Sequence, residues 1–483
     1  MSTKKIAVST LWQIASQAVM AGLSAVSVKF VAMGLSKELA GSYNSAYGYL
    51  QLFAILADFG LYAVSVKEVS KTKDQSRVLG ALLVLRVCIT LLSLGGAVLV
   101  AWFVPAWQGT PLRLGITIAS LVPFFTLLAG VLRTTFQISF KMHLVFIAEV
   151  LQRVLTASLM AWLIFAGVRG SSDPFIYQLF LWIGAIGAFL LFLISLFFSE
   201  RILPVRPCFD RALLLRLLKT ATPYGVAFLC IALYRQFDLT MIALLRPDFR
   251  TLNAEYGFAQ RISEMTYLIP TFLLNSTLPV LSERRANGEH TASLLGKTLF
   301  LILLIGATAS LFSFFWSRPL MELLTTSAYL STALSPGADT ALRFLSVPMF
   351  LNGLVLFSFY TLLTEHRWKP LVSTMLVAVV LSVVSNLFLI PAYGYVGAIV
   401  TSMIVHAFLV LTLFPRALAI LPVSFSGRSF FTLAGFTFIL GVALFLSRPF
   451  LLSELETVVA CALGVLFLAG LAWVLRVQKI VRG

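Results

Sequence analysis

Long apolar runs, separated by short stretches that carry charges, prolines and glycines, follow one another along the whole chain. A helix needs about 20 mostly apolar residues to cross the hydrocarbon core of a bilayer. On that criterion the pattern predicts fourteen spans, near residues 10–33, 43–66, 79–104, 112–134, 142–167, 175–199, 220–245, 255–281, 292–316, 338–364, 368–390, 395–415, 429–447 and 457–475. The runs are continuous rather than alternating, which excludes a membrane β-barrel. We therefore expect an all-α, polytopic membrane helical bundle.

The composition agrees with a chain that lies mostly within the membrane. Of its 483 residues, 59% are hydrophobic and 11% are charged. The formal net charge of +17 would suit nucleic-acid binding in a soluble protein. Most of the 36 lysines and arginines, however, fall at the two termini and in the even-numbered turns between spans. Cytoplasmic loops of membrane proteins are enriched in these residues. The charge therefore predicts that both termini are cytoplasmic, and it needs no nucleic-acid partner.

The longest connection on the predicted cytoplasmic side separates six spans from eight. It runs from Glu200 to Lys219 and contains five basic residues and two prolines. We expect an N-terminal lobe at 1–205, a C-terminal lobe at 206–420 and two further spans in 421–483. A weak repeat aligns Gly41–Ala46 with Ala254–Ala259, at the entry to matching spans of the two lobes. Related lobes of a transporter usually meet at a central cavity near the bilayer midplane.

Two charges lie deep in the seventh span. Arg235 and Asp238 are three residues apart, on nearly one helix face, so each can neutralise the other. A charged residue at mid-bilayer costs about 2.5–3.5 kcal/mol on insertion scales and normally faces a partner or a polar cavity. The pair is therefore either a structural ion pair or part of a hydrated pathway, and we favour the pathway.

Other spans carry similar charges. Glu149 precedes Arg153 by four residues, and Arg261 precedes Glu264 by three. Lys29 and Arg86 have no opposite charge within a helical turn, and each lies close enough to a membrane face to extend its charged end there. Asp58 suits either a coupling carboxylate or an interhelical hydrogen-bonding partner. We expect the cationic cavity residues to be Arg235, Arg153, Arg261, Arg86 and Lys29, and the coupling or charge-pair residues to be Asp238, Glu149, Glu264 and Asp58.

Enzyme signatures are absent from the sequence. It contains no Walker A loop, GxSxG, HExxH or DxD motif. The four cysteines are far apart and have no CxxC spacing, so neither a disulfide framework nor a zinc site is indicated. We expect no enzymatic activity, no cofactor and no metal site.

Two stretches resemble a known family. Residues 41–71, "GSYNSAYGYLQLFAILADFGLYAVSVKEVSK", resemble the second-span signature of bacterial polysaccharide-transport proteins and O-antigen flippases, with Asp-Phe-Gly-Leu before a basic loop. Residues 386–404, "NLFLIPAYGYVGAIVTSMI", resemble the junction between their spans eleven and twelve. Together with the fourteen-span plan, the resemblance covers nearly the whole chain. It implies membership of the multidrug, oligosaccharidyl-lipid and polysaccharide exporter superfamily.

This resemblance implies a flippase that works by alternating access. Its cargo would be an undecaprenyl-pyrophosphate-linked oligosaccharide, moved from the cytoplasmic to the outer leaflet, with a proton or sodium ion as a possible coupling ion and polysaccharide assembly proteins as possible partners. Arginines suit a pyrophosphate because a guanidinium group binds it through two hydrogen bonds. The alternatives are a cation-coupled multidrug antiporter of the same superfamily and a membrane glycosyltransferase or ligase.

Overall fold

The computed structural model describes residues 3–58, 60–287, 289–365 and 367–482, and these are helical almost throughout. The described residues contain no strand, and their only β-type pairing is an isolated bridge between Leu35 and Ser171. Each of the fourteen predicted spans coincides with a helix or with two consecutive helices. Eleven helices in the described part of the chain are long and apolar enough to cross a membrane. The predicted all-α membrane bundle is confirmed.

The chain divides into two compact units, Met1–Ala254 and Glu255–Gly483. Helix α10 (Phe249–Ala286) begins in the first unit and continues into the second. The lobe boundary predicted at residue 205 stays a prediction. The other helices of the first unit are α1 (Thr3–Gly34), α2 (Lys37–Asp58), α3 (Leu61–Lys71), α4 (Gln75–Phe103), η1 (Pro105–Trp107), α5 (Leu112–Ala119), α6 (Leu121–Ile138), α7 (Met142–Phe165), α8 (Pro174–Glu200) and α9 (Arg211–Leu245).

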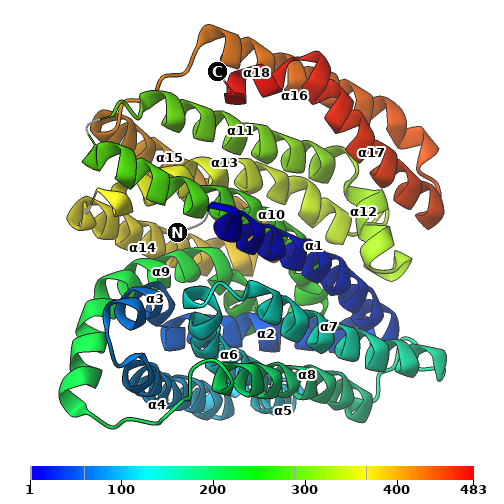
Figure 1. Ribbon diagram of the computed structural model, residues 1–483. Helices are drawn as coiled ribbons and strands as arrows, with labels where there is room; N and C mark the ends of the chain where they lie inside the picture. Colours follow the sequence, from blue (N-terminus) through cyan, green and yellow to red (C-terminus); the bar gives the residue numbers. More distant parts are fainter. Residues whose placement is uncertain (1–2, 59, 288, 366, 483) are drawn as a thin grey trace. The chain divides into compact units, whose positions relative to one another are not determined.

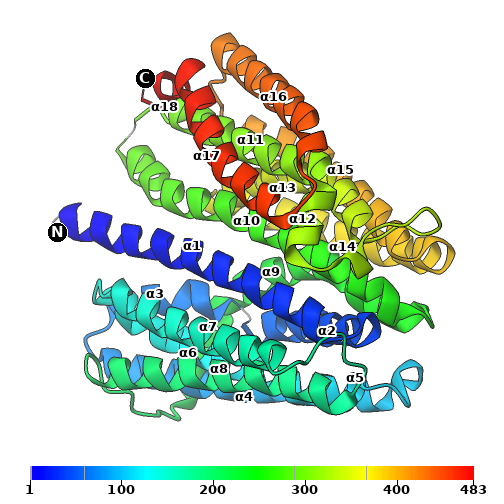
Figure 2. The ribbon, with the colours of Figure 1, turned by 90° about the vertical axis from the view of Figure 1, so that its right-hand side faces the viewer.

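Within the first unit, the helices pack in neighbouring pairs. Helix α1 lies along α7, α6 lies along α8, and α2 packs against both α4 and α9 (Figure 1). The pair α7 and α8 is seen side by side in Figure 2. Where α2 approaches the start of α10 most closely, there is no room for a side chain. At Gly41 in α2, a Cβ atom would lie 1.5 Å from the Arg250 carbonyl oxygen of α10, so only glycine permits this approach.

The second unit continues with α11 to α18. Helix α13 packs between α11 and α15, α14 packs on α15, and the last long helices, α16 and α17, pack on α11 and α12 respectively. The bounds are α11 (Ala292–Phe315), α12 (Ser317–Leu324), η2 (Ser327–Tyr329), α13 (Ala338–Thr364), α14 (Trp368–Tyr393), α15 (Tyr395–Ile420), α16 (Gly427–Ser447), η3 (Arg448–Phe450), α17 (Glu454–Val474) and α18 (Val477–Arg482).

Three details differ from the simple pattern of unbroken spans and open loops. The predicted span 43–66 is broken between α2 and α3, where Gly60 adopts a left-handed conformation with φ of 70°. The predicted span 112–134 is divided at Ser120 between α5 and α6. The connection from Ser317 to Gly337 is folded, since α12 and η2 occupy part of it and bury Met321 and Tyr329.

Candidate functional site: charged residues within the spans

Arg86 in α4 binds Asp58, the last residue of α2. The Arg86 Nη1 atom lies 2.7 Å from Asp58 Oδ1, and the Arg86 side chain is only 2% exposed. The same Nη1 donates a hydrogen bond of 3.2 Å to the Ala57 carbonyl oxygen. Extension of Arg86 to a membrane face does not fit this burial, and its place among the cavity residues stays a prediction. Its partner comes from a neighbouring helix, which spacing along one helix does not reveal.

The break between α2 and α3 explains this arrangement. The last carbonyl groups of a helix have no partner inside that helix. Because α2 ends at Asp58 and Gly60 redirects the chain, the Ala57 carbonyl oxygen is available to Arg86. The Asp58 carboxylate balances the charge of the buried guanidinium. Phe59, inside the Asp-Phe-Gly-Leu signature, lies outside the described residues. The signature thus builds a helix break that Arg86 stabilises.

Glu149 in α7 binds an arginine of the preceding helix. Arg133 Nη1 in α6 lies 3.0 Å from Glu149 Oε1, and the two side chains are 25% and 13% exposed. Sequence spacing suggests Arg153, one turn farther along α7, as the partner of Glu149. Arg133 was missed because it lies at the end of its predicted span. The contact could have been predicted from the turn between the two helices. Arg133 lies five residues before the end of α6 and Glu149 seven residues after the start of α7, so the two are at similar distances from that turn.

The cations of the first unit lie at different depths along their helices. We use "inner" for the helix end that the charge pattern predicts to face the cytoplasm. Arg86 and Arg153 each lie eleven residues from the inner ends of α4 and α7, about 16 Å at 1.5 Å per residue. Arg235 lies ten residues from the outer end of α9, about 15 Å. Lys29 lies near the outer end of α1 and is half-buried.

The polar middle of α9 is turned into the first unit. Asp238 is 2% exposed, as are Tyr234 and Thr240, while Arg235 is half-buried. Helix α9 packs chiefly on α2 in this region, and a Cβ at Gly48 would touch Leu239. Asp238 therefore does not face lipid. This placement is expected, because a charged side chain exposed to lipid is energetically costly. The other two predicted site residues, Arg261 and Glu264, belong to α10 in the second unit, where both are half-buried.

A polar network near the outer end of α2 was not foreseen. Asn253 Nδ2, in the first turns of α10, donates hydrogen bonds of 2.8 Å to Ser45 Oγ and 2.9 Å to the Leu239 carbonyl oxygen. Asn44 Nδ2 donates one of 3.1 Å to the Asn253 carbonyl oxygen. All of these side chains are buried. The small residues Gly41, Ser45 and Gly48 share one face of α2 and could have signalled the close approach.

Comparison with known families and structures identifies the protein class. The family described as "Polysaccharide biosynthesis protein" matches residues 6–285, more than half of the chain. The chain belongs to this family. No curated protein matches it.

Solved structures of a flippase and of two transporters show a similar fold. The chain is similar to the lipid II flippase MurJ in an inward closed conformation, with a TM-score of 0.70 and 14% identity over 98% of this chain and 99% of that one. It is similar to an inward-facing multidrug resistance MATE family transporter of the MOP superfamily, with a TM-score of 0.60 and 14% identity over 83% of this chain and 95% of that one. A mutant form of the Vibrio cholerae MATE transporter VcmN aligns with a TM-score of 0.54 and 13% identity over 87% of this chain and 97% of that one. This family member is thus a multi-pass membrane protein with the fold of MurJ and the MATE transporters.

Proposed function

We propose that this protein is a flippase that moves an undecaprenyl-pyrophosphate-linked oligosaccharide from the cytoplasmic to the outer leaflet of the bacterial inner membrane by alternating access. The observation that carries the proposal is the family match, together with a full-length resemblance in fold to a lipid II flippase. The charged residues inside the spans support the proposal, because a guanidinium group can bind a pyrophosphate through two hydrogen bonds.

The half-buried cations are the best candidates for contact with the pyrophosphate. Arg153, Arg235 and Arg261 are neither sealed in the core nor fully exposed. A guanidinium in a site with little water binds phosphate oxygens through paired hydrogen bonds, and the low dielectric strengthens each of them. Lys29 is half-buried as well and adds a fourth cation.

Arg86 is better suited to a positioning role. Its guanidinium already binds Asp58 and the Ala57 carbonyl oxygen. The carboxylates Asp238 and Glu264 remain the candidates for binding a proton or sodium ion, and Glu149 and Asp58 act as charge partners.

The direct test measures lipid-linked glycan on each leaflet. Cells that lack the protein are expected to accumulate this glycan on the cytoplasmic leaflet. Arg235→Ala, inserted at the normal level, should reduce delivery to the outer leaflet, while Arg201→Ala should not. Arg201 is a suitable control because its guanidinium lies over the Phe197 ring, 4.0 Å from the centroid, at the inner end of α8. Full delivery by Arg235→Ala would remove this residue from the mechanism.

A cation-coupled multidrug antiporter is the second candidate, because MATE transporters share the fold and Asp238 is a buried carboxylate. Purified protein in liposomes distinguishes the two proposals. Cation flux stimulated by cationic drugs would favour the antiporter, whereas transfer of a lipid-linked glycan without such flux would favour the flippase. Covalent change of the glycan by the purified protein would instead indicate a glycosyltransferase or ligase.

A further inference from the structure

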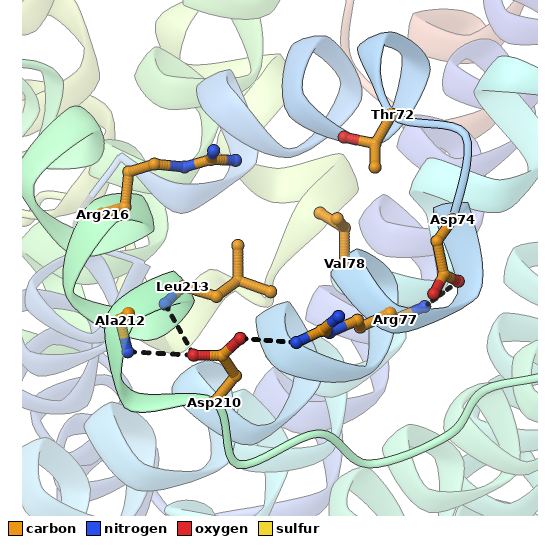
Figure 3. A pocket seen from close by; sticks show the side chains of 8 residues that line it. All are labelled: Thr72, Asp74, Arg77, Val78, Asp210, Ala212, Leu213 and Arg216. Carbon is orange, nitrogen blue, oxygen red and sulfur yellow. Dashed lines mark hydrogen bonds and ion pairs between the residues drawn. The ribbon is translucent and has the colours of Figure 1, made fainter.

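A pocket of about 390 Å³ lies in the first unit, between the turn that joins α3 to α4 and the beginning of α9 (Figure 3). It is lined by Thr72, Asp74, Arg77, Val78, Asp210, Ala212, Leu213 and Arg216. The pocket is at the inner ends of α4 and α9, where the apolar part of α4 begins. On the predicted topology, this places the pocket near the level of the phospholipid headgroups.

The walls of this pocket are held in place by direct bonds. Arg77 Nη2 in α4 lies 2.7 Å from Asp210 Oδ2, at the start of α9. The other Asp210 oxygen accepts hydrogen bonds from the backbone N–H groups of Ala212 and Leu213. These donors, Leu213 first, and the Arg77 guanidinium lower the pKa of the Asp210 carboxyl, so that it stays ionised at neutral pH.

The chain before α9 is also fixed to α4, which keeps the pocket preformed. Ser76 Oγ donates a hydrogen bond to the Pro204 carbonyl oxygen. A Cβ atom at Gly80 would lie 1.7 Å from the Arg206 carbonyl oxygen, so this part of the connection lies directly on α4. The two walls therefore do not need to be brought together by a ligand.

Some polar groups of the lining retain unused hydrogen-bonding capacity. Arg216 Nη2 binds Glu68 Oε2 at 3.2 Å, but its side chain is 60% exposed, and it extends from α9 over the pocket (Figure 3). Arg77 is 57% exposed; its Nη2 binds Asp210, and its guanidinium also interacts with the Cys208 side chain. Asp74 caps α4 through Oδ1, which accepts a hydrogen bond from the Arg77 backbone N–H. Among the described residues, no hydrogen bond to Asp74 Oδ2 is formed.

This set of groups fits a ligand that carries both charges. A simple phosphate would be attracted by two guanidinium groups but repelled by the carboxylates of Asp74, Asp210 and Glu68. If the ligand also carries a primary ammonium beside its phosphate, the Asp74 carboxylate attracts that ammonium and no longer opposes binding. Val78 and Leu213 add apolar surface for the part of the ligand next to the phosphate.

We propose that the pocket binds a phosphoethanolamine group, as carried by the headgroup of a membrane phospholipid. The phosphate accepts hydrogen bonds from Arg216 and Arg77, and the ammonium donates to Asp74. A choline headgroup cannot donate such a hydrogen bond, and a glycerol headgroup has no cation for Asp74. The pocket therefore selects ethanolamine over both.

Native mass spectrometry of the full chain tests this selection with three phospholipids that have the same acyl chains and ethanolamine, choline or glycerol headgroups. The wild type should retain the ethanolamine lipid about three- to tenfold more strongly than the other two, as expected for one charge-assisted hydrogen bond at a partly exposed site. Equal retention of the three lipids by the wild type would overturn the proposal.

Substitutions assign the two charges of the ligand. Asp74→Asn keeps a good N-cap for α4 but removes the negative charge, so it should abolish the preference for ethanolamine. Arg216→Gln should weaken retention of all three lipids. Arg201→Gln, outside the pocket, should behave as the wild type, and thermal unfolding of each variant checks that it is folded. An unchanged ethanolamine preference in Asp74→Asn would contradict the assignment.

A competition experiment identifies the source of the group. Soluble glycerophosphoethanolamine contains the same phosphate and ammonium but has no acyl chains. If it displaces the bound lipid, the site recognises the headgroup in soluble compounds as well. If it does not, the acyl chains contribute, and the natural ligand is the membrane lipid.

Discussion

The Arg86 side chain, 2% exposed within α4, is held 2.7 Å from Asp58 at the end of α2. Removal of one partner of a buried ion pair leaves an uncompensated charge and costs about 3–5 kcal/mol. Asp58 is 30% exposed, so water can partly replace it. We therefore expect Asp58→Asn to destabilise the protein by about 2–3 kcal/mol, measured as a lower unfolding midpoint in detergent.

The double variant Asp58→Asn/Arg86→Met provides the control for this prediction. It removes both charges and should recover most of the stability, because an apolar side chain of similar length can fill the space. Glycan delivery by the recovered protein would show that Arg86 has a positioning role. A stable double variant without delivery would return Arg86 to the cargo-binding residues.

The contact between Arg133 and Glu149 gives a second prediction. Reversal of either charge, by Arg133→Glu or Glu149→Arg, brings like charges together at a partly buried position. Each single variant should lose about 1–2 kcal/mol, and the double reversal should regain about 1 kcal/mol or more, within the range of coupling energies for residues in contact. The measurement is again the unfolding midpoint of the detergent-solubilised protein.

A second reversal tests the partner that sequence spacing suggests for Glu149. Glu149→Arg/Arg153→Glu exchanges the charges four residues apart on α7. If Arg133 is the main partner, this exchange should recover less stability than the exchange with Arg133. Greater recovery with Arg153 would contradict the assigned partner.

Sequence patterning predicted the helices well but not their contacts. The apolar runs are long enough to define each span, because a backbone in lipid must satisfy its hydrogen bonds within a helix. Asp58 and Arg86 are 28 residues apart and meet only because α2 and α4 run side by side. Nothing in the spacing of either helix specifies that neighbour.

Local exceptions were harder to predict than long elements. The break at Gly60 falls inside a run whose apolar character continues on both sides, so hydropathy alone extends the span through it. The contact between Arg133 and Glu149 could have been predicted from the sequence. In an antiparallel helical hairpin, residues at similar distances from the turn lie at the same depth. The α2 network required the side chain of Asn253, more than 200 residues from Ser45.

Gly41 provides a third prediction. A Cβ atom there would lie 1.5 Å from the Arg250 carbonyl oxygen, and the obstructing atom is backbone. Gly41→Ala should therefore force α2 away from the start of α10 and lower the free energy of unfolding by about 1–3 kcal/mol, as is typical of overpacked sites.

Gly95→Ala in α4 is the matched control, because nothing lies within 4 Å of its added methyl group. That control should leave stability unchanged or raise it by about 0.5–1 kcal/mol. Equal changes in stability at the two glycines would show that the close approach of α2 to α10 does not contribute to stability.

The hydrogen bond between Asn253 and Ser45 allows a test of motion. Asn253 lies in the first turns of α10, and most of that helix belongs to the second unit. Both residues belong to the first unit, so a crosslink between them tests whether the start of α10 moves against α2 within that unit during transport. Cysteines in place of Ser45 and Asn253 can be joined by oxidation only while the two positions remain close.

We expect a Ser45→Cys/Asn253→Cys protein to form this crosslink and to lose glycan delivery in proportion to the crosslinked fraction. Cys88, Cys208, Cys230 and Cys461 are all free and should first be replaced by serine. The crosslinked fraction is measured by mass spectrometry after alkylation of the remaining thiols. Reduction should restore delivery, and each single-cysteine protein should be insensitive to the oxidant. Full delivery by a fully crosslinked protein would mean that α2 and the start of α10 move as one body, and the moving contact would then have to lie farther along α10.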